Sequence, residues 1–156
     1  MDQLKFVVLD EEDLEIVSTH LQDAVVKVSD VLWRPQENRL VVALNRFDWE
    51  SAQAATPEYR RRRSALRFER VMSCKSLNVS AAGKDDVLNL LAVEFSETDE
   101  PSGNVTLTFS GGAALRLEVE CLEAELADLG PTWTTAACPA HTLAEDPPKA
   151  AQKVSK

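Results

Sequence analysis

The sequence lacks the long apolar stretches and paired cysteines that mark membrane and secreted proteins. No run approaches the ~20 consecutive apolar residues of a transmembrane helix. The first residues lack the basic segment and the longer apolar segment of a secretory signal. The three cysteines, Cys74, Cys121 and Cys138, form no close pair, which argues against a disulfide framework and for a reducing compartment. We therefore expect a cytoplasmic protein.

Motifs of the common enzyme and metal classes are also missing. The chain has no glycine-rich phosphate loop, no CxxC pair, no nucleophile elbow and no zinc-ligand spacing. His20 and Asp23 could share a helix face, but two ligands do not make a metal site, and a capping or hydrogen-bonded pair is the favoured interpretation. Cys74 and Cys121 have no histidine near them in sequence, so we interpret both as core or near-core residues. We predict no catalytic set, no metal and no cofactor.

Acidic residues outnumber basic ones, and the two kinds are unevenly spread. The formal net charge is −9, which disfavours attraction to nucleic acid or to an anionic membrane. Residues 60–75 hold seven basic side chains against one acidic side chain, whereas residues 94–130 hold nine acidic against one basic. The sequence leaves open whether these two segments pair with each other or with another molecule.

The apolar residues that are present follow the patterns of a globular domain. Residues 4–9 are apolar and of strand length. Leu14, Val17 and Leu21 follow at i, i+3 and i+7, which predicts an amphipathic helix over residues 11–21. After this helix the hydrophobic period changes to two. We predict further strands at residues 23–29, 31–34, 39–46, 64–74 and 87–96, with a turn at 35–38, a long surface loop at 47–60 and a second turn at 83–86.

The clearest local pattern is a β-hairpin near the C-terminal end. Residues 105–109 and 115–119 alternate between apolar and polar side chains and are joined through Gly111 and Gly112. Leu122, Leu126 and Leu129 then change to helical spacing, which predicts a closing helix.

These elements predict one α+β domain over residues 1–134. Its antiparallel sheet has about seven to eight strands, with one helix N-terminal to it and one C-terminal. The sheet is expected to be a sandwich or partly closed, and a PH-like barrel is one form compatible with this element order. Residues 135–156 have little to bury and are predicted to be a disordered tail.

Four consecutive arginines are the most conspicuous candidate for binding. Arg60, Arg61, Arg62 and Arg63 could grip a phosphate or carboxylate by bidentate hydrogen bonds. In a strand, however, successive side chains point to opposite faces, so at most two would converge on one ligand. The favoured alternative is a solvated run that pairs with acidic residues of the chain.

A second candidate lies where a predicted strand meets the long loop. Trp49 offers a ring for stacking and Arg46 a charge, and such strand ends often carry function. The alternative, which we favour, is that the aromatic residues anchor the loop on the core.

Several segments together resemble one family. The chain resembles the mainly alphaproteobacterial family of domains of unknown function filed under the number 2948, over about residues 4 to 143. The resemblance is carried by residues 20–24, 44–50, the arginine run at 60–63 leading into 66–68, 111–112 and 117–121, together with Asp128 and Trp133. It implies a small cytoplasmic protein and supplies no activity, cofactor or catalytic residue.

Three functions follow as hypotheses. The first is a non-enzymatic protein-binding or adaptor domain that uses its segregated charge and an exposed sheet or loop surface. The second is a binding site for a small anion that uses Arg46, Trp49 and the arginines of residues 60–63. The third, a minor one, is an enzyme whose catalytic residues are scattered along the chain.

Overall fold

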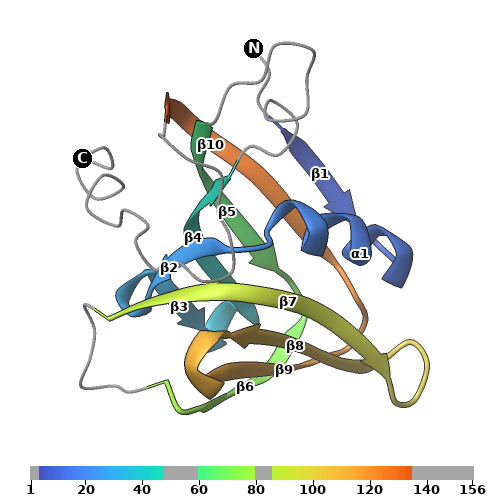
Figure 1. Cartoon of the computed structure of the whole chain (residues 1–156). Coiled ribbons are helices and arrows are strands. Elements are labelled where there is room, and N and C mark those ends of the chain that lie inside the picture. The colour runs from blue at the N-terminus through green and yellow to red at the C-terminus, as the bar shows by residue number, and fades with distance from the viewer. Residues whose placement is uncertain (1–3, 48–59, 80–85, 135–156) are drawn as a thin grey trace.

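The computed structural model describes residues 4–47, 60–79 and 86–134 (Figure 1). Residue 60 and residues 131–134 are described by their backbone alone. Most of the predicted loop at 47–60, most of the predicted turn at 83–86 and the predicted tail at 135–156 lie outside the described residues.

The described chain forms one large antiparallel sheet with a single α-helix. Helix α1 spans Glu11–His20. The strands are β1 (Lys5–Val8), β2 (Ala24–Lys27), β3 (Val31–Arg34), β4 (Arg39–Phe47), β5 (Arg60–Phe68), β6 (Val71–Leu77), β7 (Val87–Glu97), β8 (Gly103–Phe109), β9 (Ala114–Val119) and β10 (Ala124–Thr134). The fold is therefore mostly β, with ten strands where about seven to eight were predicted.

The sheet is long and open. Its strand order is β1-β10-β5-β4-β2-β7-β8-β9-β6, and β3 pairs separately with β4. Within the described ranges the order does not return from β6 to β1, so the PH-like barrel is wrong. Short 3₁₀ turns join β2 to β3 (Val28–Asp30) and β3 to β4 (Pro35–Glu37). Asn38 closes the second turn with φ 53°, a left-handed conformation that Asn tolerates, and this confirms the turn predicted at 35–38.

Helix α1 begins and packs as the sequence predicts. The side chain of Asp10 accepts a hydrogen bond from the backbone N–H of Asp13 at 2.8 Å, which caps the first turn. Leu14, Val17 and Leu21 are buried, so the apolar stripe faces the core. The helix lies beside β1 and β7 (Figure 1).

The predicted C-terminal helix is wrong, because residues 124–134 form strand β10. This strand pairs with β1 on one side and β5 on the other, which satisfies its backbone hydrogen bonds. Leu122 and Leu126 are buried, whereas Leu129 is 53% exposed. The i, i+4, i+7 leucine spacing is thus a coincidence, and a period-two row of Leu122, Ala124 and Leu126 decides the structure.

The single strand predicted at residues 64–74 is two strands. Strand β5 begins at Arg60, and β6 begins at Val71 after a turn in which Arg70 has φ 56°. The predicted hairpin at residues 105–119 is confirmed as β8 and β9. Its connection places Gly111 at φ 74° and Gly112 at φ 77°, a region that glycine enters without steric cost.

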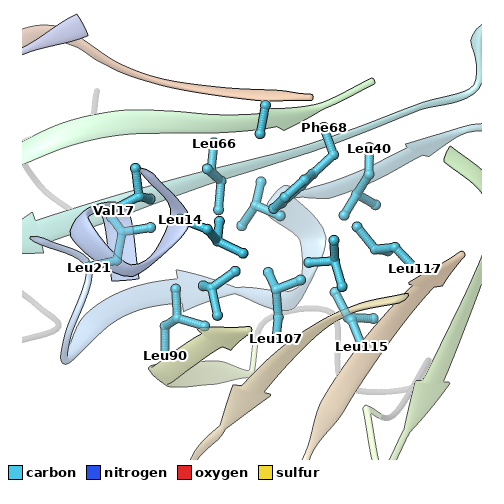
Figure 2. Close-up of a cluster of buried hydrophobic side chains, with 14 of the residues drawn as sticks. Leu14, Val17, Leu21, Leu40, Leu66, Phe68, Leu90, Leu107, Leu115 and Leu117 are labelled. Atoms are coloured by element: carbon cyan, nitrogen blue, oxygen red, sulfur yellow. The ribbon is translucent and has the colours of Figure 1, made fainter. Parts of the chain in front are cut away.

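One hydrophobic core lies between helix α1 and the curved sheet (Figure 2). Helix α1 contributes Leu14 and Val17, its C-cap residue is Leu21, and the rest comes from strands on both halves of the sheet. Figure 2 labels Leu40, Leu66 and Phe68 from β4 and β5, and Leu90, Leu107, Leu115 and Leu117 from β7, β8 and β9.

Two leucine substitutions distinguish strand β10 from the helix that the spacing suggests. We expect Leu126→Ala to lower the free energy of unfolding by about 2–5 kcal/mol, since it opens a cavity in the core. Leu129→Ala should stay within about 0.5 kcal/mol because its side chain is on the surface. Urea denaturation of the two variants measures both values. A large loss for Leu129→Ala would contradict the strand.

Candidate functional site

The arginine cluster is built where three core-facing rows of side chains end in polar residues. In β4 the row ends with Arg46, in β5 it ends with Ser64 and Arg62, and in β10 it ends with Asp128. The strands are in register here, since Arg46 pairs with Arg62 and Ser64 pairs with Asp128. The polar ends of the three rows therefore meet beside the apolar core.

Asp128 is the centre of this cluster. Arg46 donates two hydrogen bonds to its carboxylate, from Nε to Oδ1 and from Nη2 to Oδ2, each at 3.0 Å. Ser64 Oγ donates to Oδ1 at 2.6 Å, and the backbone N–H of Leu4 donates to Oδ2 at 2.7 Å. Nη1 of Arg62 lies 4.0 Å from Oδ2. One carboxylate thus joins β4, β5, β10 and the residue before β1.

The cluster is shielded from water. The side chain of Asp128 is 0% exposed and that of Arg46 is 1% exposed. Burial by itself would raise the pKa of Asp128, but the hydrogen bonds from Arg46, Ser64 and Leu4 outweigh it. The pKa of Asp128 is therefore lowered, and the carboxylate stays ionised. Removing one partner of such a buried pair leaves an uncompensated charge, which costs about 3–5 kcal/mol.

Arg61 and Arg63 lie on the opposite face of β5. Nη1 of Arg61 donates to the backbone carbonyl of Asn45 at 3.4 Å, and its guanidinium carbon is 5.8 Å from the centroid of the Phe47 ring. Arg63 donates to Oδ1 of Asn45 at 3.2 Å and to Asp30 at 3.1 Å. The run of arginines is thus divided between two faces, as strand geometry predicts.

The six residues predicted for binding are only partly gathered by the fold. Arg46 and Arg62 meet at Asp128, while Arg61 and Arg63 lie together on the other face. Arg60 is placed by its backbone only, and Trp49 lies outside the described residues. Asp128 and Ser64 were missed by the sequence prediction for this cluster. Their signal was a polar residue at a position where the period of two requires a core residue.

The basic and acidic segments of the sequence pair with each other. Nη2 of Arg67 lies 3.1 Å from Oε1 of Glu125 across β5 and β10. Arg70 contacts Glu123 at 3.1 Å and Glu120 at 3.7 Å. Part of the charge that is segregated along the chain is therefore brought together across neighbouring strands.

The other candidates have structural surroundings. Burial raises the pKa of the Cys74 thiol, which keeps it protonated, and the residue packs against the core. His20 Nδ1 lies 3.1 Å from the carbonyl oxygen of Ile16 in the last turns of α1, where a ring N–H can donate. Within residues 4–47, 60–79 and 86–134, no three His, Cys, Asp or Glu side chains gather as metal ligands. Over the same ranges no helix is long and apolar enough to cross a membrane.

A separate groove runs between helix α1 and strand β7. It has a volume of about 630 Å³, within the range of small-ligand pockets. One wall is a single face of the helix, and the other is formed by residues 91–96 of β7 with Thr106 of β8. The helix face consists of Glu11, Leu14, Glu15, Ser18, Thr19 and Gln22.

The groove exists because β7 is longer than its neighbour. β2 pairs with β7 only from Val87 to Leu90, and within the described residues no strand continues this side of β7 to Glu97. Val93 N–H instead donates to the side chain of Ser18 at 3.0 Å. Sequence reasoning predicted both strands and missed the groove, because it could not tell which strands are neighbours.

The direction of the β7 backbone follows from two hydrogen bonds. Thr98 N–H donates to Ser102 on the β8 side, whereas Val93 N–H points to the helix side. Since alternate residues of a strand direct their N–H groups to opposite edges, those of Phe95 and Glu97 also point to the helix side. The outer half of β7 is therefore a strand edge that faces a helix across a groove.

Because the carboxylate of Asp128 is buried and ionised, we expect the stability of the fold to depend on pH in the acid range. Asp128 has a lower pKa folded than its value of about 3.9 unfolded. The unfolded state therefore binds its proton first, so the stabilisation is present above about pH 5 and is lost as pH falls through the folded pKa. Asp128→Asn should lower the free energy of unfolding by about 3–5 kcal/mol at neutral pH and should flatten this acid dependence. Denaturant melts at several pH values measure both.

The matched control is Asp99→Asn in the exposed 98–102 turn, which should leave stability and its acid dependence unchanged. If Asp128→Asn is too unstable to fold, Ser64→Ala removes one hydrogen bond to the carboxylate and should cost about 1.5–3 kcal/mol. A wild-type acid dependence that persists in Asp128→Asn would contradict the role given to this carboxylate.

Comparison with known proteins places the chain in a family without a known activity. No curated protein and no solved structure matches it. A family model described as a protein of unknown function (DUF2948) matches residues 4–141, which confirms the resemblance carried by the sequence. The chain belongs to this DUF2948 family.

Proposed function

We propose that the chain is a non-enzymatic protein-binding domain, an adaptor whose partner docks in the groove between α1 and β7. The observation that supports this most is the edge of β7 beside the helix, which no strand among the described residues pairs beyond Leu90. Backbone N–H and C=O groups along such an edge are ready to pair with another chain. Natural proteins cover or charge these edges, or use them for recognition.

Side chains around the groove also suit a protein partner. Leu91 lines the groove and is 45% exposed, and the half-buried Phe95 adds apolar surface beside it. Polar groups such as Ser18 and Thr19 lie among them. Most of the residues that line the groove are polar or charged. This suits a partner that binds through its main chain, because strand addition takes its affinity from backbone hydrogen bonds. The segregated charge of the sequence contributes little to the proposal, because much of it is used in pairs between neighbouring strands.

The anion-binding alternative has weaker support. The observation in its favour is that Arg46, Arg61 and Arg62 are all buried near one end of β4 and β5. However, Asp128 already accepts two hydrogen bonds from Arg46 and lies near Arg62, and Asp30 holds Arg63. A small anion would have to compete with carboxylates of the chain for the same N–H groups. We therefore assign these arginines to the stability of the domain.

Filling the groove should weaken binding of the partner. Thr19→Trp places a large ring on the groove face of α1, whereas Ile16→Trp adds the same ring to an exposed position of the helix outside the groove. We expect the full chain to capture a specific protein from native cytosol. Thr19→Trp should weaken that capture by about tenfold or more, equal to about 1.4 kcal/mol, and Ile16→Trp should not.

Quantitative mass spectrometry of affinity-purified samples compares the three proteins, and thermal melts establish that both variants fold. An identical set of captured proteins for wild type, Thr19→Trp and Ile16→Trp would exclude docking in the groove.

A further inference from the structure

We infer that the partner enters the groove as an extended, basic segment, which pairs with the edge of β7 as an added strand. This inference rests on the proposed function and specifies the chemistry of the partner. In Figure 1, α1 lies above the half of β7 that leads to the 98–102 turn, which is the half that β2 does not pair.

The backbone of β7 offers hydrogen-bonding groups on the side of the helix. Phe95 and Glu97 direct their N–H groups to the helix side, because Val93 does so and the strand alternates. Ser18 occupies the N–H of Val93 through its side chain, so the pairing edge begins beyond this residue. An extended segment beside Phe95 and Glu97 would form the next rung of the sheet. Strand addition of this kind supplies affinity through the main chain and specificity through alternate side chains.

The charges around the groove are acidic. Glu11 and Glu15 lie one turn apart on the helix wall, and Glu94 lies on the strand wall. No Lys or Arg is among the described residues that line the groove. Like charges at i and i+4 of a helix repel, and a cation between them relieves the repulsion. The complementary segment therefore carries Lys or Arg.

Strand β7 also presents apolar side chains at the groove. The side chain of Leu91 is 45% exposed, and Phe95 is half-buried against the core. A strand placed beside them presents side chains alternately to its two faces. Apolar residues on one face would cover this surface, and basic residues on the other would reach the carboxylates. The partner segment is thus one in which apolar and basic residues alternate.

Synthetic peptides test this chemistry on the full-length chain. The probes are a short capped peptide of alternating Lys and Val and its counterpart of alternating Glu and Val. Titration calorimetry at low salt should show the Lys peptide binding at least about tenfold more tightly than the Glu peptide. Added salt should weaken this binding, because the carboxylates are near solvent.

Two matched comparisons distinguish a site from general attraction to an acidic protein. Glu15→Lys reverses a charge in the groove, and Glu12→Lys makes the same change on the same helix outside it. We expect Glu15→Lys to weaken the Lys peptide by about tenfold or more, and Glu12→Lys to leave it unchanged. Peptides N-methylated at alternate residues, in two registers, should differ in affinity, since only one register blocks the edge that faces β7.

Three results would overturn the inference. These are a Lys peptide that fails to bind or binds no better than the Glu peptide, an equal loss in Glu12→Lys, and equal affinity for both N-methylated registers. If the Lys peptide fails while Thr19→Trp still weakens protein capture, the basic strand is wrong and the groove remains the docking site. If Thr19→Trp leaves capture intact, the proposed function fails and the inference fails with it.

Discussion

The neighbouring strands β2 and β7 differ in length, so β2 pairs only part of β7. Strand β7 runs from Val87 to Glu97, but β2 pairs with it only to Leu90, and no other strand of the described ranges pairs the rest of this edge. Helix α1 supplies a partial partner, because Ser18 accepts the N–H of Val93 through its side chain. Past this contact the helix and the strand form the two walls of a groove. A backbone edge beside a helix face can recognise an extended chain without any catalytic group.

Asp128 holds together another part of the sheet, formed by β10, β5 and β4. Its carboxylate accepts hydrogen bonds from Arg46 in β4, Ser64 in β5 and the backbone of Leu4 before β1. An ionised group in such a place is tolerated because nearly every lone pair is used, and its loss would leave buried arginines uncompensated. The arginines that are conspicuous in the sequence thus belong, in large part, to the architecture. Their burial also explains why a chain of net charge −9 does not display a basic surface made by these residues.

Local patterns predicted most elements, and long-range pairing decided the rest. Helix α1 and the hairpin of β8 and β9 depend on nearby residues, on the Asp10 cap and on Gly111 and Gly112, so the sequence alone predicted them. Strand β10 was mistaken for a helix because Leu122 and Leu126 fit both a helical period and a period of two, and only pairing with β1 and β5 selects one. The partners of Arg46 were hidden for the same reason, since Asp128 is 82 positions away. The groove forms because β7 lies between β2 and β8 in the sheet, and no local sequence pattern reveals which strands are neighbours.

The most direct test of the open edge is amide hydrogen exchange along β7 in the free protein. Glu94 and Ser96 should exchange slowly because their N–H groups point to β8, while Phe95 and Glu97 should exchange quickly because theirs point to the groove. The open edge therefore predicts that fast and slow amides alternate within one strand, and residue-resolved exchange measured by NMR can detect this alternation. Uniform protection from Glu94 to Glu97 would mean that the edge is already paired, and would contradict the account.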